Sequence, residues 1–70
     1  MMPLTLGNAG EENIIKKVGG NEKVKRHLEN LGFTPGESVT LISTLEGNVI
    51  VKVKESRIAL DEGMASKIMI

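Results

Sequence analysis

Residues 27–37, HLENLGFTPGE, lead from the end of a helix into a tight turn and so set the direction of the chain. If the helix ends just before Gly32, this glycine takes the left-handed conformation that other residues adopt only at a cost. Phe33 then falls where a Schellman motif forms its hydrophobic contact, here with Leu28. Pro35-Gly36 suits the central positions of a type II turn, because proline fixes the first φ and glycine supplies the positive second one. The stretch predicts a rigid structural corner.

The helix before this corner is expected to begin after Asn21, whose side chain can accept a hydrogen bond from a free backbone N–H of the first turn. Glu22 suits the positive end of the helix dipole. Val24, Leu28 and Leu31 are spaced at i, i+4 and i+7, which is typical of one core-facing stripe on a helix of about three turns.

Short segments with apolar residues at every second position predict strands on both sides of this helix. In the first of them the inward face stays open, because Ile14 and Val18 share one parity and Ile15 has the other. The turn-like segment 44–47 favours an antiparallel hairpin between the second and third strands. The expected strands are residues 12–18, 38–43, 48–54, 57–60 and 67–70.

Five short strands cannot build two stacked sheets of useful size, so we expect a bent sheet curled into a small barrel. The predicted class is mainly β, with one α-helix between the first and second strands and a single domain over residues 1–70. The core must be aliphatic, since Leu, Ile and Val supply 20 of the 70 residues and Phe33 is the only aromatic side chain.

The composition disfavours several functions. Nine Lys and Arg balance nine Asp and Glu, so no net field attracts phosphate backbones, and one Phe cannot form a stacking platform for nucleic acid. No apolar run approaches the roughly 20 residues that span a bilayer, and no signal peptide is recognisable. Without cysteine the chain has neither disulfides nor thiolate zinc sites. We expect a cytoplasmic protein without direct membrane insertion or nucleic-acid binding.

No group of residues has the pattern of a catalytic site, so an enzyme is not expected. His27, the only histidine, has no carboxylate three or four residues away on the helix, which favours a solvated side chain. A weak metal site shared between two copies is the alternative for His27. The neighbouring carboxylates Asp61 and Glu62 are interpreted as capping groups of a short helical turn rather than an acid and base pair.

Two aliphatic residues near the predicted hairpin have no obvious place in the core. Leu45 lies at the hairpin tip beside Glu46, and Ile50 shares its strand face with Lys52, opposite the valines of that strand. Exposed apolar groups can form a docking site, although single exposed aliphatic residues are common. The candidate partner-binding patch is Leu45, Glu46, Ile50 and Lys52.

The order of these signals resembles the FeoA family of ferrous iron transport proteins over nearly the whole chain. The most specific part is Leu-Gly-Phe-x-Pro-Gly at residues 31–36, supported by Arg-Ile-Ala-Leu at 57–60 and Ala-x-x-Ile at 65–68. Glu55 departs from the family pattern, which has glycine after the central strand.

The resemblance implies an SH3-like barrel and a small cytosolic accessory protein of bacterial ferrous iron uptake. As an interaction module, such a protein would act on the cytosolic side of the membrane iron permease as a monomer or weak homo-oligomer. A similar domain forms the C-terminal domain of some metal-dependent repressors. The alternative is therefore a metal-responsive regulatory domain that binds a divalent transition metal such as Fe2+ weakly. His27 would then be the candidate ligand.

Overall fold

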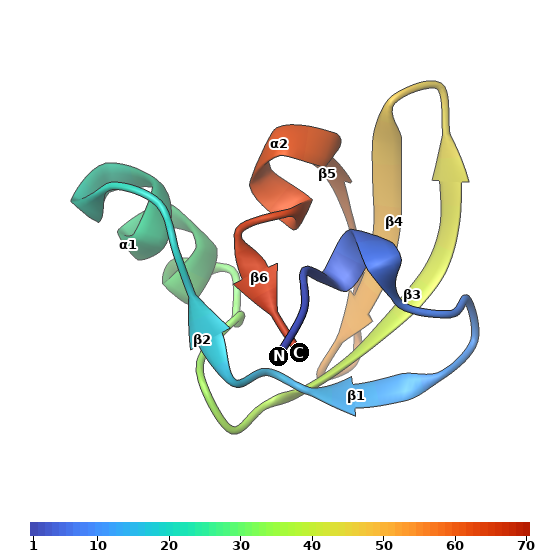
Figure 1. Ribbon diagram of the computed structural model, residues 1–70, viewed down its shortest axis with the longest axis horizontal. Coiled ribbons are helices and arrows are strands. Elements are labelled where there is room, and N and C mark those ends of the chain that lie inside the picture. The colour runs from blue at the N-terminus through green and yellow to red at the C-terminus, as the bar shows by residue number, and fades with distance from the viewer.

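A four-stranded antiparallel sheet in the order β1-β3-β4-β5 curls around the core, and a two-stranded sheet of β2 and β6 lies against it (Figure 1). The computed structural model describes residues 1–70. The elements are η1 (Leu4–Leu6), β1 (Glu12–Ile14), β2 (Lys17–Val18), α1 (Glu22–Asn30), β3 (Ser38–Leu45), β4 (Asn48–Val53), β5 (Ser56–Asp61), α2 (Glu62–Ala65) and β6 (Ile68–Met69). The predicted mainly β class is confirmed, with six strands because the first predicted strand is divided in two.

The corner after α1 has the predicted geometry. Gly32 takes a φ of 109°. The Phe33 N–H donates to the Leu28 carbonyl at 3.0 Å, and the Gly32 N–H donates to the Glu29 carbonyl at 3.0 Å. These two bonds define a Schellman motif. The side chains of Phe33 and Leu28 are both fully buried, so the helix end is fixed by backbone bonds and by the core together.

The turn that follows the corner holds the first strand region in place. Gly36 has a φ of 93°, and the Glu37 N–H donates to the Thr34 carbonyl at 3.0 Å, as in a type II turn. Ile15 bonds to this turn through both of its backbone groups, accepting from Gly36 at 2.8 Å and donating to Glu37 at 2.9 Å.

This contact explains why the first strand divides. Ile15 pairs with the turn, β1 before it pairs with β3, and β2 after it pairs with β6. The chain changes direction at this point, so Ile15 and Val18 are both buried although they differ in parity. Ile14, on the other face, is 51% exposed.

The predicted helix and its caps are confirmed. The Asn21 Oδ1 accepts from the Val24 N–H at 2.9 Å. Leu28 is buried, and Val24 packs half-buried against the core. Asp61 caps α2 in the same way, accepting from the Met64 N–H at 2.7 Å. No helix in the structure has the length and apolar character needed to span a bilayer.

The hairpin of β3 and β4 is longer than predicted. Strand β3 continues to Leu45, and the register shifts between Leu41 and Ser43 because Ile42 is an extra residue on β3. The turn consists of Glu46 and Gly47 alone, with φ values of 47° and 84°, as a type I′ turn requires. The prediction ended this strand at Ser43 because the bulge interrupts the alternation of apolar residues.

The next turn accounts for the departure at Glu55. The positive φ between β4 and β5 belongs to Lys54, at 56°, whereas Glu55 is not among the residues with positive φ. Glu55 therefore occupies a position that does not require glycine here.

One aliphatic core fills the interior of the sheet. The N- and C-terminal ends of the chain lie side by side, since Met2 and Ile70 exchange backbone hydrogen bonds of 2.9 and 2.7 Å. The buried residues are Leu4, Ile15, Val18, Leu28, Phe33, Val39, Leu41, Val49, Val51, Val53, Leu60, Ala65, Ile68 and Ile70.

Candidate interaction surface

The outer face of the four-stranded sheet carries most of the predicted patch. Along β4 the valines 49, 51 and 53 are buried, so the residues between them face outward. Ile50 is half-buried on this outer face, and Lys52 is exposed. Opposite them across the ladder lie Ser43 and Thr40 of β3. The patch therefore lies on the two central strands of the sheet.

Leu45 joins this face at the end of β3. Its side chain is 65% exposed, and its ladder partner is Asn48. Ile50 pairs with Ser43, two residues before Leu45, so Leu45 and Ile50 are diagonal neighbours on one face, at a typical spacing of about 7–8 Å. The structure thus brings two aliphatic side chains together near the end of the hairpin.

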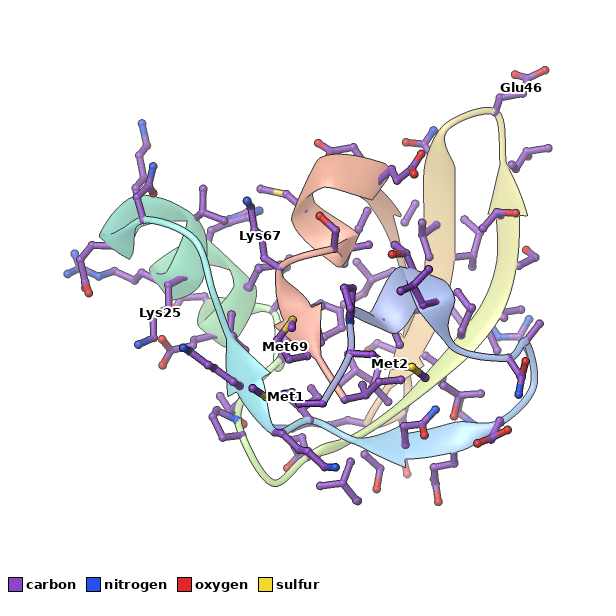
Figure 2. The ribbon with its side chains drawn as sticks, in the orientation of Figure 1. Met1, Met2, Lys25, Glu46, Lys67 and Met69 are labelled. Atoms are coloured by element: carbon purple, nitrogen blue, oxygen red, sulfur yellow. The ribbon has the colours of Figure 1, made fainter.

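Glu46 does not share this face. It occupies the turn at the far tip of the hairpin and points away from the body of the molecule (Figure 2). It borders a hollow of about 300 Å³ beside the turn, whose lining is mainly polar. The residues of this hollow are Thr5, Thr44, Glu46, Gly47, Asn48, Val49 and Glu62.

Lys52 borders a second and smaller hollow of about 160 Å³, which continues the outer face toward β1. Its lining is charged and hydroxylated, and consists of Glu12, Glu37, Ser38, Thr40, Lys52 and Lys54. The outer face therefore changes from aliphatic near the hairpin tip to mixed charge near the opposite end.

Two further apolar residues were not assigned from the sequence: Ile42, which extends this surface, and Ile14, which pairs with Ser38 at the end of β3 opposite Leu45. Ile14 of β1 is 51% exposed, and Ile42, the bulged residue of β3, is half-buried. The signal for Ile42 is its position directly after Leu41, because two successive apolar residues interrupt a period-two strand. Ile14 could not be assigned because the break at Ile15 depends on a distant turn.

His27 lies on the exposed side of α1, away from the sheet. It borders an open depression together with Glu22, Lys23, Arg26 and Asn30. The cationic side chains on either side of this histidine disfavour a bound cation. No group of three or more His, Cys, Asp or Glu side chains is placed to hold a metal ion.

Solved structures with this architecture define the class of fold. FeoA from Stenotrophomonas maltophilia, crystallised with zinc and described as a prokaryotic SH3 domain protein, matches with a TM-score of 0.85 at 24% identity over 99% of this chain and 88% of that one. Iron(II) transport protein A from Clostridium thermocellum matches with a TM-score of 0.88 at 23% identity, over 97% and 43%. A manganese-dependent transcriptional repressor matches with a TM-score of 0.84 at 13% identity, over 94% and 38%. The chain has the predicted SH3-like fold.

Its sequence defines the family. The FeoA domain model matches residues 2–70. "Putative Fe(2+) transport protein A" from Methanocaldococcus jannaschii is 36% identical over 70 residues, which are 100% of this chain and 85% of that protein. The chain therefore belongs to the FeoA family, as its corner motif and strand order predict.

Proposed function

We propose that this chain is a cytoplasmic accessory protein of ferrous iron uptake that acts as an interaction module on the membrane iron permease, without catalysis of its own. Membership in the FeoA family supports the link to ferrous iron transport. The observation that carries the interaction is the pair Leu45 and Ile50 on the outer face near the tip of a projecting hairpin (Figure 1).

The chemistry of this face suits a protein partner. Leu45 provides apolar surface that water covers in the free protein, and its burial against a partner would contribute favourable free energy at roughly 25 cal/mol per Å². Lys52 and the charged hollow beside it can supply orientation, because charges at the rim of an interface steer encounter and fix register. We place the permease contact on the outer faces of β3 and β4.

A pull-down with the cytosolic part of the permease tests this surface. The variants Leu45→Asp and Ile50→Asp should lose capture, because each places a charge where the interface must be apolar. Leu6→Asp is the matched control, since Leu6 lies in η1 outside the sheet and is 68% exposed, close to the 65% of Leu45. Equal capture of all three variants would exclude the proposed surface.

A metal-responsive regulatory domain is the second candidate. The fold shared with a manganese-dependent repressor and the zinc complex of a FeoA structure favour it. His27 is the only imidazole available, and Lys23 and Arg26 beside it oppose strong binding. Weak binding of a divalent transition metal would therefore need ligands from a second molecule.

Titration with ferrous iron under anaerobic conditions, followed by backbone amide NMR, separates the two functions. Line broadening confined to the neighbourhood of His27 and absent in His27→Ala would support regulation by metal. Unchanged spectra at millimolar metal together with capture by the permease would support the accessory function and exclude metal regulation through His27.

A further inference from the structure

Strand β5 is an open edge of the four-stranded sheet. It pairs with β4 on one side and ends the strand order on the other. None of the backbone hydrogen bonds outside the strand ladders and helices involves residues 56–61. An unpaired edge of this kind presents free N–H and C=O groups to any strand that can lie beside it.

The residues whose backbone groups face outward can be identified. The Glu62 N–H donates to the Gly47 carbonyl at 3.1 Å, on the side of β4. Backbone groups alternate in direction along a strand, so those of the even-numbered residues of β5 face β4. The N–H and C=O groups of Arg57 and Ala59, and the N–H of Asp61, therefore face the open edge.

The side chains of the same three residues are exposed. They place a cation and an anion four residues apart with a small residue midway between them. Because antiparallel pairs that exchange hydrogen bonds must join outward-facing residues, only a few registers are open to two copies of β5. Centring on Ala59 sets Ala59 opposite itself and Arg57 opposite the partner's Asp61, and the second Arg-Asp pair follows by symmetry.

We propose that two copies of this chain pair through the edges of β5, antiparallel and centred on Ala59, to form a continuous sheet across a two-fold axis. Ala59 exchanges backbone hydrogen bonds with the partner's Ala59, and the Arg57 carbonyl accepts from the N–H of the partner's Asp61. On the opposite face Ile58, which is half-buried, lies beside the partner's Leu60 and gains cover from it.

The charges on β5 distinguish this pairing from simple protection of an edge. Exposed edges are frequently protected by lysine side chains, whose like charges repel a second copy. Arg57 and Asp61 have opposite signs and attract in the register that pairs all three outward-facing residues. The dimer also sets two copies of the outer face of β3 and β4 on one sheet, while Leu45 and Ile50 stay outside the contact, so the dimer does not depend on the proposed permease function.

Sedimentation equilibrium of the full chain from micromolar to millimolar concentration tests the proposal. The wild type should show a monomer–dimer equilibrium that weakens with salt, because the two ion pairs are exposed. Arg57→Glu should raise the dissociation constant about tenfold, since both cross-strand pairs become repulsive. Lys16→Glu is the matched control, because it makes the same charge change at an exposed residue between β1 and β2, at the opposite end of the strand order from β5, and it should change the constant little.

A disulfide test reports the register directly, because the natural chain has no cysteine. In Ala59→Cys the two introduced residues face each other with Cα atoms about 5.5 Å apart, within the range of about 4.4–6.8 Å that a disulfide spans. In Arg57→Cys they are offset by four residues, about 13 Å along the strand. Under oxidised glutathione only Ala59→Cys should form a covalent dimer quickly.

Three results would overturn the proposal. They are a wild type that stays monomeric at millimolar concentration, equal effects of Arg57→Glu and Lys16→Glu, and equal crosslinking of the two cysteine variants. If Arg57→Glu abolishes permease capture while the wild type is monomeric, the edge binds a strand of the permease instead of a second copy.

Discussion

Replacing Gly32 by alanine isolates the energetic cost of the left-handed corner. An added Cβ would lie 3.8 Å from the nearest atoms, in the side chains of Lys54 and Val53, which is ordinary van der Waals contact. The φ of 109° is therefore the main source of strain. A left-handed conformation costs an L-residue about 1–2 kcal/mol. Alanine also lowers the conformational entropy of the unfolded chain, which stabilises the folded state by about 0.4–1 kcal/mol.

The net loss expected for Gly32→Ala is thus roughly 0.5–1 kcal/mol of the free energy of unfolding. Gly32→Val should lose more, because a β-branched side chain at positive φ is a stronger outlier. Gly19→Ala is the matched control, since Gly19 is not among the glycines with positive φ and its added Cβ would lie 3.5 Å from the nearest atom. This control should gain about 0.4–1 kcal/mol.

Urea and thermal unfolding followed by circular dichroism measure both variants. The difference in unfolding free energy between Gly32→Ala and Gly19→Ala cancels the unfolded-state contribution, so it should equal the strain at Gly32, about 1–2 kcal/mol. For a domain of this size each kcal/mol corresponds to about 4–8 °C in Tm. If Gly32→Ala is as stable as Gly19→Ala, the corner is not held in place by the left-handed glycine, and the explanation of the 27–37 stretch is wrong.

Three further substitutions test local elements by the same unfolding measurements. Asn21→Ala should cost about 1 kcal/mol because α1 loses its N-cap, whereas Asn8→Ala, which removes only an exposed side-chain bond, should cost little; equal losses would deny the cap its role. Glu46→Asn should stabilise the hairpin by about 0.5–1 kcal/mol, because asparagine enters a type I′ turn more readily than glutamate, and a loss would contradict the turn assignment. Phe33→Ala should remove about 3–5 kcal/mol, much of the stability of a small domain, and an NMR spectrum that keeps native dispersion with full stability would refute its place in the core.

Local chemistry made the corner and both helix caps predictable from the sequence. Gly32, Asn21 and Asp61 each act on backbone groups within three residues of themselves, so no distant contact is needed to recognise them. The resemblance to a known family then implied an SH3-like barrel, whereas the alternation of apolar residues alone only favoured a small barrel of short strands.

Features that depend on distant contacts could not be predicted. The first strand divides at Ile15 because a turn some twenty residues later binds that residue, and nothing near Ile15 indicates it. The β3 bulge at Ile42 interrupts the alternation of apolar residues, so the sequence predicted the turn at residues 44–47, whereas the structure places it at Glu46 and Gly47. Glutamate at a positive φ also gives no local turn signal.

The arrangement of the candidate patch residues was predictable only in part, because it depends on which residues share a face of the folded sheet. Leu45 and Ile50 were recognised as aliphatic residues without a core position, and the structure sets them on one face near the hairpin tip. Glu46 was assigned to the patch by proximity in sequence, but it lies at the tip, apart from that face. Ile14, whose inward face the sequence left open, is exposed beside Ser38 at the end of β3 opposite Leu45.

The most direct test of the proposed interaction is an NMR titration of the ¹⁵N-labelled chain with the cytosolic part of the permease. Shift changes should concentrate on the amides of residues 43–52, with the strongest around Leu45 and Ile50, and should disappear in Leu45→Asp while persisting in Leu6→Asp. Changes confined to α1 or to the edge of β5, or no change at saturating permease, would contradict an interaction through the hairpin face.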